Sequence, residues 1–194
     1  KDGAKEDAKR IYKDILEKFP KNKKAIDGLK AVSKVTTAKK SNTQDPPQNQ
    51  LHSLINLYTQ GQYQKTLNEA SNLLVGFPNS INLYGIIGIA NQGLGKLGEA
   101  VEAYKKALSI KPDFAEAHYN MGNALQDQGK LDEALDAFNK ALSIKPDYAG
   151  AYNNMGNTLK NLGKLEEAIE AYNKAISIQP DFSEAYNNMG IALP

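Results

Sequence analysis

AEAHYNMGNALQDQGKLDEALDAFNKALSIKPDY, residues 115–148, is the stretch that decides the fold, because residues 149–182 repeat it with 20 identities. Residues 81–114 keep the same skeleton of small, aromatic and proline positions at the same spacing. The same unit therefore occurs at least three times in succession along the chain. Because each unit of a repeat array buries its apolar side against its neighbours, this regular period predicts a stacked row rather than a single globular core.

Each unit reads as two amphipathic helices joined by a glycine turn. In the first half, Ala117, Met121 and Leu125 recur at helical spacing. Gly129 follows them at the place where a left-handed residue commonly ends a helix. The second half repeats the helical period, and Pro146 follows its last turn, where a helix cannot continue. The apolar positions of the second half are Leu131, Ala134, Leu135, Phe138, Ala141 and Leu142.

The unit resembles the tetratricopeptide repeat (TPR) family. The resemblance lies in the 34-residue period, a Met-Gly pair in the first helix, an aromatic residue between two alanines, and a closing proline. It implies an all-α fold, a right-handed superhelical solenoid of antiparallel helix pairs. The chain is similar to the repeat array of O-linked N-acetylglucosamine transferase and to bacterial TPR proteins. The residues that carry the pattern are Met121, Gly122, Ala134, Phe138, Ala141 and Pro146.

Fragments of the same pattern occur outside the regular units. Residues 4–19 read as a second helix, and residues 51–80 as a divergent repeat in which Thr66 and Ala70 replace the usual alanine and aromatic residue. The alignment of the first of these segments pairs Ala8, Ile11, Tyr12, Ile15 and Pro20 with Ala134, Ala137, Phe138, Ala141 and Pro146.

The sequence therefore predicts a single array with a fixed order of segments. Because its ends carry half-repeats, we expect apolar surface there and possible self-association through the chain ends. The predicted segments are residues 1–40, partial N-terminal repeats consisting of a second helix and the following first helix; 41–50, a polar linker with two prolines; 51–80, a divergent TPR; 81–114, 115–148 and 149–182, three TPRs; and 183–194, a truncated first helix of a further repeat.

Composition limits the function classes. The chain has no cysteine, which excludes thiolate catalysis and cysteine metal sites. Residues 1–40 hold 13 basic and 6 acidic side chains, but the signs alternate and no aromatic platform accompanies them, so we expect no nucleic acid partner. No apolar run approaches the roughly 18 residues of a membrane span, and no signal peptide is visible. The sequence thus predicts no membrane partner and a cytoplasmic location.

Motifs that could carry chemistry have structural explanations. Gly93, Gly95 and Gly98 spell G-x-G-x-x-G, but the pattern falls between two predicted helices and lacks the preceding strand that a dinucleotide site needs. His118 holds a position that is tyrosine in neighbouring repeats, which favours packing over ligation, and His52 has no acidic or histidine neighbour at helical spacing. We therefore predict no catalytic residues, no metal and no cofactor, and the chain is not expected to be an enzyme.

Function is then expected from a surface, and the resemblance implies which one. In TPR proteins the first helices line the concave side of the superhelix, where extended peptides bind. The matching positions here are rich in amides, which can both donate to and accept from a peptide main chain. The predicted peptide-binding residues are Tyr119, Asn120, Asn123, Gln126, Asp127, Asn153, Asn154, Asn157, Lys160, Asn161, Glu184, Asn187 and Asn188.

The residues at these positions also limit which kind of partner we expect. Family members that grip the C-terminal carboxylate of chaperones use lysine and arginine where this chain has Asn123 and Asn154, and Glu184 would repel a carboxylate. The sequence therefore predicts an interaction scaffold for an extended protein or peptide segment. Two alternatives stay open: the non-catalytic substrate-recognition arm of a larger glycosyltransferase- or sulfotransferase-type enzyme, and a self-association module that stacks through its incomplete ends.

Overall fold

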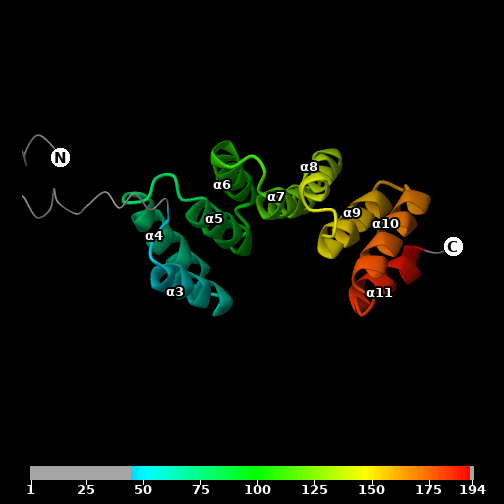
Figure 1. Cartoon of the computed structure of the whole chain (residues 1–194), viewed down its shortest axis with the longest axis horizontal. Helices are drawn as coiled ribbons and strands as arrows, with labels where there is room; N and C mark the ends of the chain where they lie inside the picture. Colours follow the sequence, from blue (N-terminus) through cyan, green and yellow to red (C-terminus); the bar gives the residue numbers. More distant parts are fainter. Residues whose placement is uncertain (1–44, 193–194) are drawn as a thin grey trace, which may run out of the picture. The chain divides into compact units, whose positions relative to one another are not determined.

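The computed structural model of the chain describes residues 45–192, and the predictions for residues 1–40 lie outside them. Within the described range the regular structure is entirely α-helical, as Figure 1 shows, which confirms the all-α fold class. The helices are α3 (Gln48–Thr59), α4 (Tyr63–Leu74), α5 (Ile81–Gly93), α6 (Leu97–Ile110), α7 (Ala115–Asp127), α8 (Leu131–Ile144), α9 (Ala149–Asn161), α10 (Leu165–Ile178) and α11 (Ser183–Ala192).

Helix α3 begins at Gln48, inside the segment predicted as a linker. Pro47 takes the cap position before this helix with ψ of 144°, an extended conformation that proline adopts readily. The two prolines therefore exclude helix only up to residue 47, and the polar residues behind them join the first turn. Asp45 is tied to the next hairpin, because its carboxylate accepts a hydrogen bond from the Ser80 hydroxyl at 2.5 Å.

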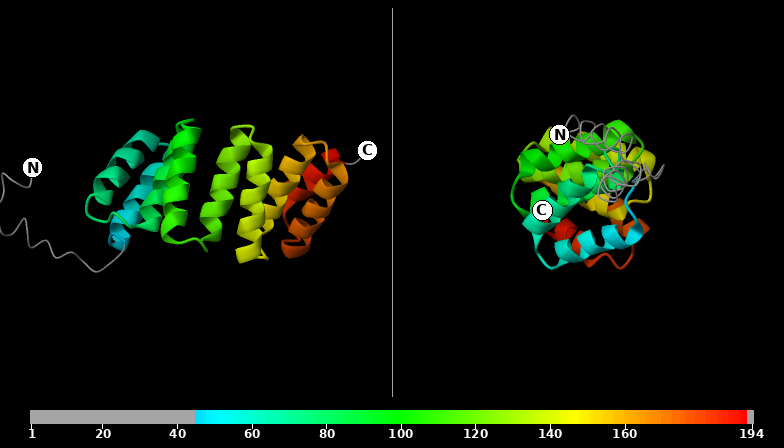
Figure 2. Two further views of the ribbon diagram at one scale, coloured as in Figure 1. Left: turned by 90° about the horizontal axis from the view of Figure 1, so that it is seen from above. Right: turned by 90° about the vertical axis from the view of Figure 1, so that its left-hand side faces the viewer.

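The helices form a row of antiparallel pairs in which each hairpin packs on the next (Figure 2). The first helices of successive hairpins, α3, α5, α7, α9 and α11, touch one another along this row. Within residues 45–192 the second helices α4, α6, α8 and α10 make no such contacts with each other. Because the first helices lie closer together than the second ones, the row curves with the first helices on its concave side. This arrangement is the expected superhelical solenoid.

Glycine has two separate tasks in each hairpin. Gly129 ends α7 with φ of 74°, and Gly163 ends α9 with φ of 77°, so both occupy the left-handed region that glycine adopts without strain. Gly122 and Gly156, within the helices, admit an aromatic ring instead. A Cβ atom at Gly122 would lie 2.6 Å from the Phe138 ring. We call such a glycine and the ring seated on it a ring socket.

The ring sockets hold the core of the regular hairpins. Phe138 and Tyr172 are completely buried in them, and Tyr104 fills the equivalent place above Gly88. Each ring closes one hairpin, while the alanines beside it let the adjacent helices approach. The aromatic residues predicted for the core are therefore interior, at the spacing that the repeat period requires.

The divergent repeat achieves the same packing with the two sizes exchanged. Leu54 stands one repeat period before Gly88, and Ala70 stands one repeat period before Tyr104. Both are buried, with 1% and 0% of their surface exposed, and they belong to one apolar cluster. The large side chain thus comes from the first helix and the small one from the second. This exchange keeps the volume between the helices nearly constant, which cores tolerate best.

Candidate functional site

The residues predicted for peptide binding lie on three neighbouring first helices, α7, α9 and α11, on the concave side of the row. We call the surface that they form the inner face. All of them except Asn153 keep some solvent exposure. Half-buried are Tyr119, Asn120, Asn123, Gln126, Asn154, Asn157, Lys160 and Asn188, and exposed are Asp127, Asn161, Glu184 and Asn187.

Amide side chains connect the helices of the inner face. Asn154 on α9 donates through Nδ2 to Asn123 Oδ1 at 2.8 Å and to the Tyr119 hydroxyl at 3.2 Å, both on α7. On the other side of α9, Asn188 of α11 donates through Nδ2 to Asn153 Oδ1 at 3.0 Å. The bonds join residues 31 to 35 positions apart, so they hold successive repeats rather than turns of one helix.

Asn153 differs from its predicted role. It is only 1% exposed, and its amide is fully engaged. Its Nδ2 donates to Glu184 Oε1 at 3.0 Å and to Asn154 Oδ1 at 3.2 Å, while its Oδ1 accepts from Asn188. A buried amide with all its groups paired has nothing to offer a ligand. Asn153 therefore fastens α9 to α11 and does not belong to the surface.

Asn123 and Asn157 occupy equivalent positions on α7 and α9, and only the oxygen of each side-chain amide is hydrogen-bonded. The Oδ1 atom of Asn157 accepts from the Tyr172 hydroxyl at 2.8 Å, and that of Asn123 accepts from Asn154. Within residues 45–192 neither Nδ2 group has a hydrogen-bond partner. A hydrogen bond to the oxygen of an amide fixes the orientation of the whole amide group. Both side chains therefore hold the N–H groups of their Nδ2 atoms in a set direction. The inner face thus carries two fixed donors one repeat apart.

Tyr172 of the second helix α10 contacts the inner face through its hydroxyl group. Its ring is buried in the ring socket of Gly156, and only its hydroxyl meets the amide of Asn157. Burial raises the pKa of Tyr172 to about 12, so the hydroxyl remains a donor at neutral pH. Phe138, the equivalent residue of the preceding hairpin, has no hydroxyl. There Asn154 supplies the missing donor to Asn123.

Aromatic residues form one edge of the inner face between α7 and α9. The rings of Tyr119 and Tyr148 lie 4.8 Å apart, and Lys145 Nζ lies 4.6 Å from the centre of the Tyr148 ring. Burial, followed by the nearby Tyr119 and Glu116, raises the pKa of Tyr148 to about 12. This cluster places two aromatic rings next to the amides that join α7 and α9.

The described residues offer little for metal or phosphate chemistry. Among residues 45–192 no three histidine or acidic side chains gather in a way that could hold a metal ion. His118 is buried with Nε2 at 3.0 Å from the Pro112 carbonyl oxygen, as a packing residue would be. The G-x-G-x-x-G glycines lie at the end of α5, in the turn and in α6, so the motif joins two helices.

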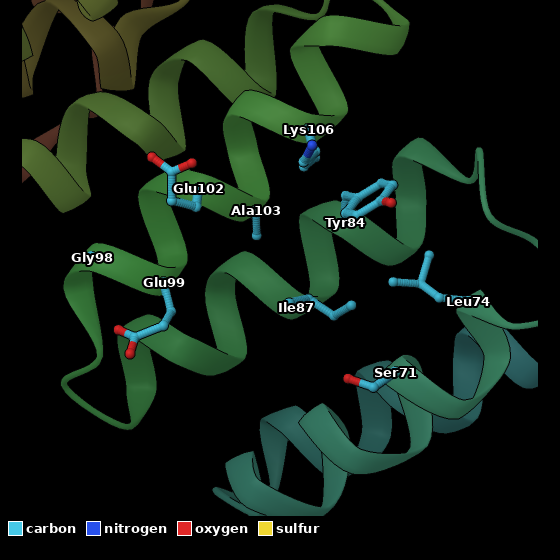
Figure 3. A pocket seen from close by; sticks show the side chains of 9 residues that line it. All are labelled: Ser71, Leu74, Tyr84, Ile87, Gly98, Glu99, Glu102, Ala103 and Lys106. Carbon is cyan, nitrogen blue, oxygen red and sulfur yellow. The ribbon is translucent and has the colours of Figure 1, made fainter.

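A hollow that the sequence pattern did not indicate lies between α4, α5 and α6 (Figure 3). It measures about 720 Å³, and Leu74, Tyr84 and Lys106 are among its walls. A smaller hollow of about 520 Å³ uses Leu108, His118 and Lys140, the equivalent positions of the next repeat. These are the gaps left where the second helices spread apart, so they follow from the curvature of the row.

Comparison with known proteins decides the family. Family models described as "TPR repeat" and "Tetratricopeptide repeat" match residues 94–129 and residues 115–148 and 149–182, respectively. A crystal structure of MamA is similar to 71% of the chain, with 31% identity, a TM-score of 0.65 and 80% of MamA covered. The chain belongs to the tetratricopeptide repeat family. TPR repeats generally serve as non-catalytic modules for protein–protein interaction, and the chain is accordingly an interaction scaffold.

Two further TPR structures show how widely the array is shared. The first TPR domain of Spaghetti (RPAP3), bound to the HSP90 peptide SRMEEVD, is similar to 58% of the chain, with 26% identity, a TM-score of 0.57 and 89% of that domain covered. PilF of Pseudomonas aeruginosa, at 19% identity and a TM-score of 0.70, covers 75% of the chain, with 66% of PilF covered, and shows the fold alone. No curated protein sequence matches the chain. None of the helices described in the TPR array has the length and apolar character needed to cross a membrane.

Proposed function

We propose that the TPR array binds an extended peptide segment along the inner face, over α7, α9 and α11. The observation that carries this proposal is the pair of oriented amide N–H donors, the Nδ2 groups of Asn123 and Asn157. The oxygens of the two amides accept hydrogen bonds of 2.8 Å from neighbouring side chains, and among residues 45–192 the two Nδ2 groups have no hydrogen-bond partner. A peptide in an extended conformation presents carbonyl oxygens at regular intervals, and such donors would bind them whatever the side chains are.

The proposed binding surface is the predicted set without Asn153. Asn154 contributes mainly by orienting Asn123, and Tyr119 adds apolar area beside it. The other contributors we expect are Asn120, Gln126, Asp127, Lys160, Asn161, Glu184, Asn187 and Asn188.

The charges of the surface favour an internal segment over a free C-terminus. Asp127 and Glu184 are exposed acids, and Lys160 is the one cation of the proposed set. The negative charge of Glu184 would repel a terminal carboxylate. It would not repel an internal peptide segment whose side chains are neutral or basic. The RPAP3 domain is bound to a peptide that ends in EVD, and we propose that this chain differs from it in the ligand end that it accepts.

Asparagine-to-aspartate substitutions test this role without disturbing the fold. Asn157→Asp keeps an oxygen to accept from Tyr172 and replaces the amine donor by a second acceptor. Asn173→Asp, on the outward-facing helix α10, adds the same charge away from the inner face and is the matched control. Peptides selected from a random phage-displayed library on the wild-type chain are the probe, and fluorescence polarisation measures their affinity.

We expect Asn157→Asp to weaken the selected peptides at least about tenfold, the scale of one charge-assisted or desolvated hydrogen bond. Asn173→Asp should leave affinity unchanged, and an amidated peptide should bind as well as its free acid. The proposal fails if the selected peptides bind both variants equally. It also fails if they depend on the free carboxylate.

A further inference from the structure

The first helices α3 and α5 continue the concave side of the row beyond α7, but with different side chains. Counted by the repeat period, Ile89 on α5 and Ile55 on α3 stand at the position of Asn123. The glycines that close these helices, Gly61 and Gly95, keep the same period and have left-handed φ values of 73° and 71°, so the structure supports the alignment. The position that carries an oriented amide on α7 and α9 is therefore isoleucine on α3 and α5.

These isoleucines give the concave side apolar surface. Ile55 is 44% exposed, and Ile89 is half-buried, as is Tyr58, one helical turn after Ile55. The Tyr58 ring packs on the Tyr63 ring with 5.3 Å between their centres. Tyr63 in turn lies 2.8 Å from where a Cβ at Gly93 of α5 would be, so α3 and α5 are held together. We call Ile55, Tyr58 and Ile89 the apolar end.

The polar group of α5 beside the apolar end is already used by the protein. Gln92 lies one turn after Ile89, at the position of Gln126. Its Oε1 accepts from the Tyr104 hydroxyl at 2.8 Å, and its Nε2 donates to Asp127 Oδ2 at 3.4 Å. Both polar atoms of Gln92 are thus bonded within the array, so the apolar end differs from the donors of α7 and α9 and would bind an apolar side chain.

The order of the helices places the apolar end next to the donors. The first helices α3, α5, α7 and α9 follow one another along the row, and each contacts the next (Figures 1 and 2). Packed helices lie about 8–10 Å apart, and every third residue of a polyproline II chain faces the same side about 9 Å further on. A segment in this extended form whose carbonyls bind Asn157 and Asn123 would therefore reach Ile89 about three residues later and Ile55 about six residues later.

We infer that the peptide on the inner face is anchored at one end by two apolar side chains, one on Ile89 and the other against Ile55 and Tyr58. The inference rests on the proposed function and names the class of ligand: an extended segment with two aliphatic or aromatic residues about three positions apart. Where its main chain meets the amide donors, no particular side chain is required. The donors thus supply affinity with little selection, and the apolar end supplies the selection.

The peptides selected on the wild-type chain test the anchor from the ligand side. They should share two apolar residues about three positions apart, near one end of the bound segment. Changing either of these residues to alanine in the tightest peptide should weaken binding at least about tenfold in fluorescence polarisation, because the burial of a large apolar side chain is lost. Alanine at the other positions should change affinity less than about threefold.

Substitutions in the array test the anchor from the other side. Ile55→Asn and Ile89→Asn introduce the residue that stands at this position on α7 and α9, and each should weaken the tightest peptide at least about tenfold. Neither should weaken it further once the matching peptide residue is alanine, because the same contact is then already lost. Ile144→Asn, at a 38% exposed position of the second helix α8, is the matched control and should leave affinity unchanged.

Thermal melting followed by circular dichroism establishes that each variant is folded. Ile89 also packs partly against the buried cluster of Tyr104 and Phe138, so its substitution can cost stability. If Ile89→Asn does not fold, Ile55→Asn at the more exposed position carries the test.

The outcomes separate this inference from the proposed function. Binding that is weakened by Asn157→Asp but not by Ile55→Asn or Ile89→Asn would overturn the anchor and leave peptide binding at the inner face standing. Selected peptides without a shared apolar pair would do the same. Binding that none of the three variants weakens would overturn both proposals. Binding that only the isoleucine variants weaken would support the anchor and overturn the role of the amide donors.

Discussion

In the divergent repeat the large and the small core side chain have changed places between the two helices. This exchange predicts that the same swap in a regular repeat should restore stability. Leu54 and Ala70 occupy the two positions that Gly122 and Phe138 occupy two repeats later, and all four residues are buried. If the volume between the helices is what matters, the pair Gly122→Leu with Phe138→Ala should restore the packing that each substitution alone destroys.

The magnitudes follow from known core substitutions. Phe138→Ala removes a ring that is 0% exposed and should cost about 3–5 kcal/mol of unfolding free energy. Gly122→Leu would push side-chain atoms into that ring, since even a Cβ would lie 2.6 Å from it, and should cost about 1–3 kcal/mol. Independent effects would sum to about 4–8 kcal/mol. A volume-conserving exchange should instead cost about 1.5 kcal/mol or less, which gives a coupling of at least about 2.5 kcal/mol.

Urea unfolding followed by circular dichroism measures these terms for the wild type, the two single variants and the double variant. The slope against urea has to stay constant across the four proteins, because partial unfolding of a repeat array would lower it and invalidate the comparison. The reverse exchange, Leu54→Gly with Ala70→Phe, provides the mirror experiment. Additive losses in both cycles, within about 0.5 kcal/mol, would refute the idea that the divergent repeat keeps the fold by exchanging volume between helices.

Three further outcomes can be checked on the same protein. Gly129→Ala should lower the unfolding free energy by about 1–2 kcal/mol, because alanine is strained at φ of 74°, whereas Gly98→Ala in the first turn of α6 should be neutral or stabilising in the same urea titration. Because burial raises the pKa of Tyr172 to about 12, the proton held by the folded state stabilises it fully below the ordinary tyrosine pKa of about 10, and this contribution is lost as pH rises through 12. Stability should therefore fall between pH 10 and 12, and Tyr172→Phe should flatten that fall; an unchanged slope would place the hydroxyl in water. The pair of Lys145 Nζ and Glu116 Oε1, 4.0 Å apart and about half exposed, should contribute less than about 0.5 kcal/mol, so that Glu116→Gln leaves the melting temperature nearly unchanged.

The sequence predicted the fold because the repeat supplies its own alignment. Gly129 and Gly163 have positive φ where the turn was expected, and Phe138 and Tyr172 are interior. The packing of the divergent repeat was harder to predict. The sequence shows that Ala70 replaces the usual aromatic residue, but it does not show that Leu54 fills the space which that residue leaves. A large residue in a first helix reads as ordinary apolar periodicity, and only its contact with the second helix shows what it replaces.

The inner face could be predicted only as a surface, not residue by residue. Asn153, Asn154 and Asn157 have the same composition and similar helical spacing, yet one is buried, one links two helices and one keeps a free donor. Their differences come from neighbours far along the chain, such as Tyr172 and Asn188. Helical periodicity places a side chain on a face but does not say which of its polar atoms another helix has already taken.

The aromatic core and the inner face are therefore linked through single hydroxyl groups. Tyr104 donates to Gln92 Oε1 at 2.8 Å and Tyr172 donates to Asn157 Oδ1 at the same distance, so in two hairpins the ring that closes the core also turns an amide of the first helix. An amide whose oxygen accepts such a bond is oriented by it, and its N–H groups then point in a set direction. A tyrosine at this buried position thus orients an amide from within its own hairpin, whereas the Phe138 hairpin leaves that task to Asn154 of the next repeat. In both cases the amide on the inner face is oriented, but by a bond inside one hairpin in the first case and between two hairpins in the second.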